Sequence, residues 1–402
     1  MLSRLAAVAA AAALVFTAPP APADDVRGGQ RQVIDTLDLA KAWRTSKGGG
    51  VTVAVLDSGV DPRHRDLVGS VRVGRDFTAG ANPPGVAPRR LHGTYMASLI
   101  AGHGHGPKGE QGIIGVAPES DVLSVRVILE DEEPGFREFN SAERFENVVA
   151  RGIRYAVDKG ADVINMSISK ELATRQERAA VRYAISKGVV LVAAAGNEGD
   201  RKARGDFAPY SYPAAFPGVV SVGATDRRLR RAAFSNWNSS VQVAAPGVDI
   251  MGAGPGDQYW VGRGTSQATA LVSGIAALIK AKYPGMSPPF VAQAITAGAR
   301  DRPPGGYDTA TGFGVVNAAG ALAEAARLAR HTETASGPGS HDPAEPLAGG
   351  RSGPIEVIVR DDKRIATYAA IAAAGAAGAI ASLSVIFILV RRVRRAYDRQ
   401  DA

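Results

Sequence analysis

Cysteine is absent from all 402 residues. Its absence excludes disulfide bonds, thiolate metal sites and cysteine nucleophiles, but it leaves the cellular compartment open, because a large core needs no covalent crosslinks. Excess charge is also scarce: the formal net charge is +8, and half of it comes from Arg4 and the last twelve residues. The rest of the chain carries too little positive charge for a nucleic-acid-binding surface. Phosphate-loop patterns and fixed-period repeats are missing as well.

The N-terminal residues 1–23 have the pattern of a secretory signal peptide. Arg4 precedes an uncharged run from Leu5 to Phe16, and Ala21-Pro22-Ala23 follows as a small-residue cleavage site. A buried N-terminal helix is the alternative, but the apolar run is short and is followed by prolines. We therefore expect cleavage near Ala23, and only 33 residues separate Asp24 from Asp57.

A long uncharged segment lies near the C-terminus. From Ala366 to Val390 there is no charge for 25 residues, enough for a helix to cross a hydrocarbon core of about 30 Å. The arginines within 391–395 follow at once, and the positive-inside rule then puts the C-terminus in the cytoplasm. The sequence thus predicts a transmembrane helix over 365–390 and a basic tail over 391–402. The alternative is a soluble alanine-rich helix.

The segment before this helix, residues 331–364, begins with a stretch rich in Gly, Pro, Ser and acidic residues, without an apolar period. Such a composition predicts a flexible tether and a juxtamembrane segment. The folded body before it is expected to cover residues 33–330, preceded by a short extension over 24–32.

The body alternates short apolar runs with amphipathic stretches, and hydrophobic residues make up 45% of the chain. Runs that are apolar throughout are typical of strands buried on both faces of a parallel sheet. Together with helical spacing between them, they predict an α/β fold with a doubly wound, mainly parallel sheet and helices on both faces. The apolar runs are Val51-Leu56, Val122-Ile128, Val163-Met166, Val189-Ala194, Val219-Val222 and Val241-Ala244, and the helical stretches are Ser141-Lys159, Ala173-Lys187 and Ser266-Tyr283.

Four polar residues stand at the junctions where such folds gather their ligands. Singly, Asp57 is an ordinary turn former, His92 an ordinary helix-start residue and Ser266 an ordinary helix cap. Taken together, they provide what acyl transfer needs: Ser266 as the nucleophile, His92 as the general base and Asp57 to orient the imidazole. Asn197, after another buried strand, adds an amide donor for an oxyanion beside the Ser266 backbone N–H.

These residues lie in segments that resemble the subtilisin-like serine proteases, the peptidase S8 family. The resemblance implies serine endopeptidase activity with Asp57, His92 and Ser266 as the triad, Asn197 in the oxyanion hole, and no required cofactor or catalytic metal; structural calcium is left open. It also implies a substrate pocket walled by Ser167, Ile168, Ser169, Ala194, Ala195 and Gly196. The matching segments are DSGVD at 57–61, HGTYMASLIAG at 92–102, VINMS at 163–167, AAAGNEG at 193–199, VAAPGVDI at 243–250 and GTSQAT at 264–269.

Three positions depart from the family pattern. Gln267 and Ala270 replace the usual Met and Pro after the serine, and Ser169 stands where Gly is usual in the pocket wall. Neither Gln267 nor Ala270 supplies a triad function, so activity is still expected. Ser169 is expected to narrow or polarise the pocket, and the specificity of relatives therefore does not transfer.

The overall layout resembles the mycosins, membrane-anchored subtilases associated with type VII secretion. It consists of a signal peptide, a subtilase body without a long propeptide, a tether and one C-terminal membrane helix with a basic tail. This resemblance implies a catalytic domain outside the cell membrane, a protein or peptide substrate, and membrane components of the secretion system as partners. A largely non-catalytic scaffold subunit and a general surface subtilase are the alternatives.

Other polar features are interpreted as structural. His103 and His105 lie in a glycine-rich GHGHG loop without further metal ligands nearby, and His64 lies in the turn after Asp57. The acidic run from Glu130 to Glu133 has the composition of a solvated loop. Its place in the chain also suggests a substrate-binding edge, from which a preference for basic residues upstream of the cleaved bond follows as a hypothesis.

Overall fold

The computed structural model describes residues 26–200, 207–335 and 362–397. These residues fall into two compact units, which are a body over 26–335 and a single helix, α11 (Asp362–Tyr397). The predicted signal peptide, most of the predicted tether and the end of the tail lie outside the described residues.

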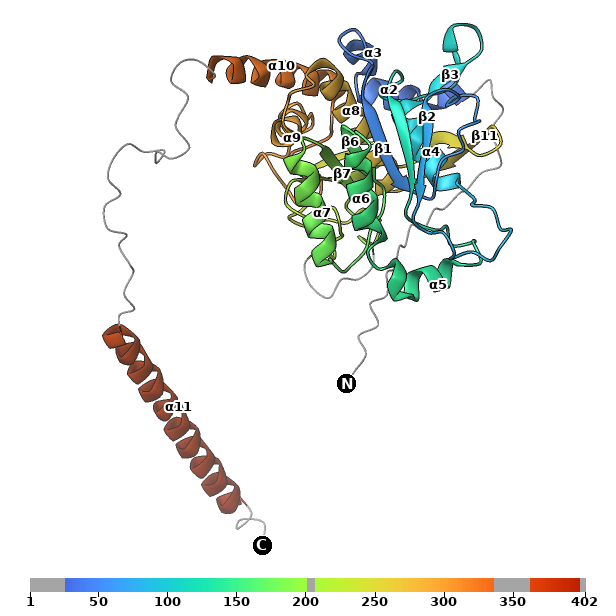
Figure 1. Ribbon diagram of the computed structural model, residues 1–402. Coiled ribbons are helices and arrows are strands. Elements are labelled where there is room, and N and C mark those ends of the chain that lie inside the picture. Colours follow the sequence, from blue (N-terminus) through green and yellow to red (C-terminus); the bar gives the residue numbers. More distant parts are fainter. Residues whose placement is uncertain (1–25, 201–206, 336–361, 398–402) are drawn as a thin grey trace. The chain divides into compact units, whose positions relative to one another are not determined.

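The body is built around a seven-stranded sheet in which every neighbouring pair is parallel (Figure 1). The strand order is β2-β5-β1-β6-β7-β8-β9. Because parallel strands all end at the same edge, the residues that follow β1, β5, β6 and β7 come close together. The strands are β1 (Thr52–Asp57), β2 (Val71–Asp76), β5 (Asp121–Arg126), β6 (Val163–Met166), β7 (Val190–Ala194), β8 (Val219–Thr225) and β9 (Val243–Pro246).

Helices cover both faces of the sheet, which confirms the predicted fold class. Alternate residues of β1 point to opposite faces: Val53 and Val55 join one hydrophobic core, and Ala54 and Leu56 join the other. The first core is closed by α4 (Leu91–Ala101) and α8 (Thr265–Lys282). The second is closed by α6 (Val148–Asp158) and α7 (Arg175–Ser186), the two neighbouring green helices of Figure 1.

All six apolar runs coincide with strands of the sheet, but the sequence pattern missed β2. This strand lies at the edge beside β5, and four of its six side chains are exposed. An edge strand with so little buried surface shows no apolar run. Its pairing with β5 is also irregular between Val73 and Asp76.

Two predicted helices agree with the structure within about two residues, and the third begins later than expected. The stretch from Ser141 to Lys159 contains the end of α5 (Phe136–Ser141), a single 3₁₀ turn (Glu143–Phe145) and then α6. Ala142 is extended, at φ −84° and ψ 128°, and this breaks the helix. The break lets Phe145 pack against Phe139, with ring centroids 5.0 Å apart.

Shorter elements complete the body. Val26 in α1 is fully buried, so the expected extension over 24–32 in part packs onto the domain. Helix α10 runs to Ala335, past the predicted domain boundary at 330. The remaining elements are α1 (Val26–Gly29), α2 (Arg31–Thr36), α3 (Leu39–Ala42), α9 (Pro288–Ala297), α10 (Ala318–Ala335), the 3₁₀ turn Pro107–Gly109, and two hairpins, β3 (His103–His105) with β4 (Gln111–Ile114) and β10 (Ile250–Gly254) with β11 (Gln258–Gly262).

The second unit, α11, is apolar over Ala366–Leu389, a stretch of 24 residues that is long enough to cross a membrane. The side chains of this stretch are all exposed. A helix that is apolar on every side needs an apolar surrounding, which the described residues of its unit do not supply.

Candidate active site

Asp57 is the last residue of β1, and its carboxylate is fully buried. Its Oδ1 accepts a hydrogen bond from the Ser58 backbone N–H at 2.7 Å and lies 2.7 Å from His92 Nδ1. The other oxygen, Oδ2, has no hydrogen-bond partner among the described residues. The carboxylate therefore holds the imidazole through one oxygen and leaves one ring nitrogen, Nε2, on the far side.

His92 lies in the first turn of α4 and is almost fully buried. The next residue must be glycine, because a Cβ on Gly93 would come within 2.1 Å of the Gly59 carbonyl oxygen. That close approach brings the start of α4 against the loop after β1. Burial opposes charge on the ring, but the Asp57 charge and hydrogen bond, with a further contribution from Glu130, outweigh it and raise the pKa of His92.

Ser266 lies in the first turn of α8, directly opposite the end of β6. Its Oγ donates to the Ser167 carbonyl at 3.2 Å, and Ser167 Oγ donates back to the Ser266 carbonyl at 2.9 Å. No described residue bonds to His92 Nε2, so the serine hydroxyl is directed at Ser167 and not at the imidazole in this structure. Ser266 Oγ and His92 Nε2 thus lie on two different helices, α8 and α4, and no hydrogen bond joins them in this structure.

Asn197 follows β7 and is tied to the start of the same helix. Its Oδ1 accepts from both the backbone N–H and the Oγ1 hydroxyl of Thr265, at 2.9 and 3.0 Å. With the oxygen held by two donors, the amide nitrogen is the part left to donate to a ligand. The side chain therefore sits at the N-terminus of α8, where the helix dipole favours negative charge.

The six predicted pocket residues lie on two neighbouring segments. Ser167, Ile168 and Ser169 follow β6, whereas Ala194, Ala195 and Gly196 end or follow β7, which pairs with β6. Ser211 Oγ donates to Ser169 Oγ at 2.6 Å, so the unusual serine is held by a hydrogen bond.

A model of the subtilase family matches residues 48–314. The chain belongs to the subtilase family. Subtilisin from Bacillus pumilus is 37% identical over 237 residues, which are 59% of this chain and 79% of that protein. Thermitase from Thermoactinomyces vulgaris is 36% identical over 243 residues, covering 60% and 79% of the two chains. The protein is accordingly a subtilisin-like serine endopeptidase.

Solved structures of the mycosin MycP1 are similar to this subtilase. MycP1 from Mycobacterium smegmatis has a TM-score of 0.61 and 29% identity, covering 72% of this chain and 84% of that one. A MycP1 structure described as a serine protease and an essential component of the type VII (ESX-1) secretion system has a TM-score of 0.63 and 31% identity, covering 76% and 92%.

The acidic run of this subtilase differs from the solvated loop that its composition predicted. Glu130 is only 7% exposed and Glu133 only 3%, whereas Asp131 and Glu132 are exposed. Glu133 pairs with Arg126 at 2.6 Å, and Glu130 Oε1 accepts from the His92 backbone N–H at 3.0 Å. The interpretation as a solvated loop was wrong for Glu130 and Glu133, because burial of a side chain depends on the elements that pack against the loop.

Glu130 is thus a site residue that sequence reasoning missed. The sequence carries no local signal for it: Glu130 lies four residues past Arg126, and only the structure shows that Arg126 pairs in register with Asp57. Gln267 and Ala270, the two departures in α8, are fully buried, and the Gln267 side chain contacts the Tyr95 hydroxyl.

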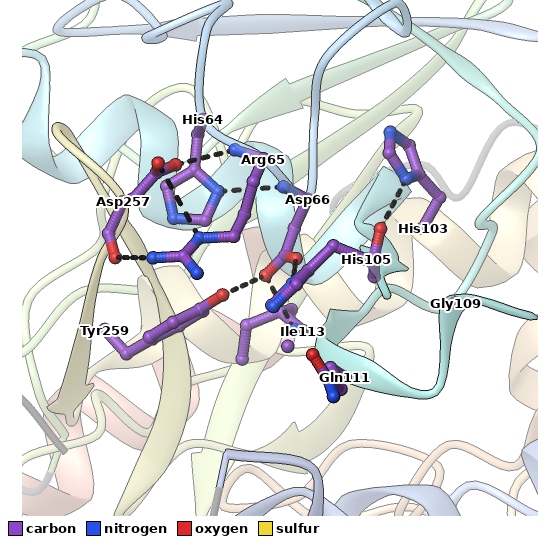
Figure 2. Close-up of polar contacts among 12 residues, drawn as sticks. His64, Arg65, Asp66, His103, His105, Gly109, Gln111, Ile113, Asp257 and Tyr259 are labelled. Atoms are coloured by element: carbon purple, nitrogen blue, oxygen red, sulfur yellow. Dashed lines mark hydrogen bonds and ion pairs between the residues drawn. The ribbon is translucent and has the colours of Figure 1, made fainter. Parts of the chain in front are cut away.

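His103 and His105, which were weighed as metal ligands, lie together with His64 in a separate cluster around Asp66 (Figure 2). His105 Nδ1 is 2.6 Å from Asp66 Oδ1, and His64 Nδ1 accepts from the Asp66 backbone N–H at 3.1 Å. His103 instead contacts the carbonyls of Gly104 and Val68. Within the described residues there is no group of three or more His, Asp or Glu that could hold a metal ion.

Proposed function

We propose that Asp57, His92 and Ser266 form the catalytic triad of this endopeptidase. The observation that carries the proposal is the contact between Asp57 Oδ1 and His92 Nδ1 at 2.7 Å, with the opposite ring nitrogen unpaired. A buried carboxylate in this contact selects the imidazole tautomer that carries its proton on Nδ1. Nε2 is then a base with its lone pair available to a hydroxyl.

The reaction begins when the Ser266 hydroxyl leaves the Ser167 carbonyl and turns to His92 Nε2. Ser266 Oγ attacks the substrate carbonyl carbon as its proton passes to His92. His92, now an imidazolium stabilised by Asp57, gives this proton to the leaving amine, and an acyl-enzyme on Ser266 remains. A water molecule then loses a proton to His92 and attacks the ester carbonyl carbon, and His92 returns this proton to Ser266 Oγ as the carboxylic acid product leaves. None of these reaction steps needs a cofactor.

Asn197 is proposed as the oxyanion donor, together with the Ser266 backbone N–H. Thr265 holds the amide oxygen, so the nitrogen is oriented before substrate arrives and costs little reorganisation in the transition state. The segments 167–169 and 194–196 are proposed as the walls of the pocket for the residue before the cleaved bond.

Labelling with a fluorophosphonate probe tests the triad. We expect the full-length protein in detergent to label at Ser266, and Ser266→Ala and His92→Ala to lose the label. Ser287→Ala, which changes an exposed serine before α9, is the matched control and keeps it. Labelling that persists in Ser266→Ala would place the nucleophile elsewhere.

The membrane location is a second part of the proposal. Helix α11 is proposed to cross the cell membrane once over 365–390, with residues 391–402 in the cytoplasm and the catalytic domain, about 33–330, outside. The exposed apolar stretch and the arginines that follow it support this orientation. Residues 1–23 would then be the signal peptide, 24–32 an N-terminal extension and 331–364 a tether and juxtamembrane segment.

Association with type VII secretion is proposed from the similarity to MycP1, which is described as an essential component of such a system. A strain that carries Ser266→Ala would separate the two possible roles. If proteolysis serves secretion, export of secreted substrates stops in this strain. Export that continues while deletion of the gene abolishes it would favour the scaffold role.

A further inference from the structure

We propose that Glu130 is a positioning residue for His92, because a single carboxylate oxygen joins the loop after Asp57 to the backbone of the histidine. This inference rests on the proposed role of His92 as the general base. Glu130 itself touches neither the Ser266 hydroxyl nor either imidazole nitrogen through a described hydrogen bond, so its action is indirect.

The contacts form a closed ring around the base. Glu130 Oε1 accepts from Ser58 Oγ at 2.7 Å and from the His92 backbone N–H at 3.0 Å. The Ser58 backbone N–H donates to Asp57 Oδ1, the oxygen that also faces His92 Nδ1. Asp57, Ser58, Glu130 and His92 therefore hold one another, and the end of β1 cannot shift relative to the start of α4 without breaking a buried contact.

A fifth contact extends the ring by one residue. Ser58 Oγ, while donating to Glu130, accepts from the Gly93 backbone N–H at 3.1 Å. Thus Glu130 and Ser58 together satisfy the N–H groups of His92 and Gly93, two of the donors that a helix leaves unpaired at its N-terminus. The carboxylate caps α4 from a loop 38 residues away in the sequence, where no local pattern reveals it.

The charges around His92 decide whether Glu130 also acts electrostatically. Asp57 faces the ring from β1, and Glu130 faces it from the loop after β5. Arg89, just before α4, lies 3.8 Å from Glu130 Oε2, but it is 41% exposed and closer to Glu132, at 3.1 Å. Arg126 is taken up by Asp76 and Glu133, and Arg90 interacts with Asp61.

Glu130 therefore keeps a buried negative charge close to His92 that the exposed Arg89 neutralises only in part. Such a charge favours the imidazolium over the neutral ring. It also favours the imidazolium that forms when Ser266 loses its proton, which is the charge that develops during catalysis. The position and the charge of Glu130 thus both support His92 as the general base.

Glu130→Gln separates charge from position, because the amide keeps an acceptor oxygen of the same size. With a chromogenic peptide and the full-length protein, we expect the acid limb of kcat/KM to move to lower pH by at least about half a unit, with KM little changed. Glu132→Gln removes one exposed charge from the same loop and should leave the limb in place. An acid limb in Glu130→Gln that coincides with that of the wild type would overturn the electrostatic part.

Glu130→Ala tests the positional part. Loss of the acceptor frees two buried donors and the start of α4, so we expect kcat to fall roughly 10- to 100-fold with a smaller change in KM. Glu130→Gln should recover most of this loss. If alanine and glutamine variants have the wild-type kcat, Glu130 has no positioning role.

A direct titration keeps the inference testable apart from the enzyme's activity. In the Ser266→Ala variant, the His92 ring can be followed by NMR against pH, and adding Glu130→Gln should lower its titration midpoint. A wild-type protein that cleaves nothing would contradict the proposed function alone, since the midpoint would still report on Glu130. An unchanged midpoint in an active enzyme would contradict the electrostatic role of Glu130 and leave the proposed function intact.

Discussion

Two buried aspartates of this subtilase each hold a histidine. Asp57 Oδ1 lies 2.7 Å from His92 Nδ1, and Asp66 Oδ1 lies 2.6 Å from His105 Nδ1. Both aspartates are fully buried, and both pairs join residues 35 to 39 positions apart. By contact geometry alone the two pairs are almost the same, but the surroundings of the two carboxylates differ.

The difference lies in what else each member of the pair contacts. Asp66 Oδ2 also accepts from the Ile113 backbone N–H at 2.7 Å and the Tyr259 hydroxyl at 2.9 Å, so this carboxylate ties three segments together (Figure 2). Asp57 Oδ2 has no partner among the described residues, and His92 Nε2 is likewise unpaired. A carboxylate that accepts from all these donors is a structural clamp, whereas the Asp57 carboxylate has only the Ser58 N–H and His92 Nδ1 as hydrogen-bond partners among the described residues.

The largest effect should follow from breaking the two pairs in the same way. Asp57→Asn stabilises the wrong imidazole tautomer and should lower kcat by roughly 10⁴-fold. Asp66→Asn, which keeps the shape of the clamp, should change kcat by less than about threefold when measured on folded protein at 25 °C. A comparable loss of kcat in both variants would show that the pairs are not functionally distinct.

For stability we expect the larger effect from the pair around Asp66. Asp66→Ala leaves the Ile113 N–H and the Tyr259 hydroxyl without their buried acceptor, which should lower the free energy of unfolding by about 3 kcal/mol and the melting temperature by about 5 °C. His105→Gln, at a side chain that is 18% exposed, should cost about 1 kcal/mol. Thermal unfolding in detergent measures both, and an unchanged melting temperature in Asp66→Ala would contradict the clamp.

The smallest expected effect is on pH dependence: His92 should affect the pH profile of kcat/KM, whereas His64 in the Asp66 cluster should affect the pH profile of stability. Because Asp57 raises the pKa of His92 above its usual 6.5, kcat/KM should fall with an acid-limb midpoint above pH 6.5. Burial lowers the pKa of His64, whose Nδ1 accepts from the Asp66 N–H, so its contribution to stability is present above pH 6.5 and is lost on acidification. The His92 contribution has the reverse sign: it is present below pH 6.5 and is lost as pH rises through the raised pKa.

His64→Gln isolates the stability part of this prediction. It removes a group that takes up a proton on unfolding, so the melting temperature of the variant should fall less than that of the wild type between pH 8 and 5. The acid limb of kcat/KM should stay where it is, because His64 is not part of the ring around His92. An equal fall in melting temperature would mean that His64 does not titrate on unfolding.

The pattern of apolar residues was enough to predict the central part of this fold. Six apolar runs, from Val51 to Ala244, coincide with strands, because burial on both faces of a parallel sheet leaves a local mark on composition. Asp57, His92, Asn197 and Ser266 could be proposed for a related reason: each lies at or next to an element boundary, and the boundary itself is visible in the sequence. The long uncharged stretch of α11 was equally evident.

Features that depend on packing between distant segments could not be predicted from the sequence. The edge strand β2 is mostly exposed and carries no apolar run, and nothing near Glu130 in the chain distinguishes it from the exposed Glu132. The same holds for the two aspartate–histidine pairs: spacing does not tell which carboxylate will be saturated by donors from distant segments. Local periodicity records the burial of an element, whereas a buried charge takes its role from partners that the fold brings from far along the chain.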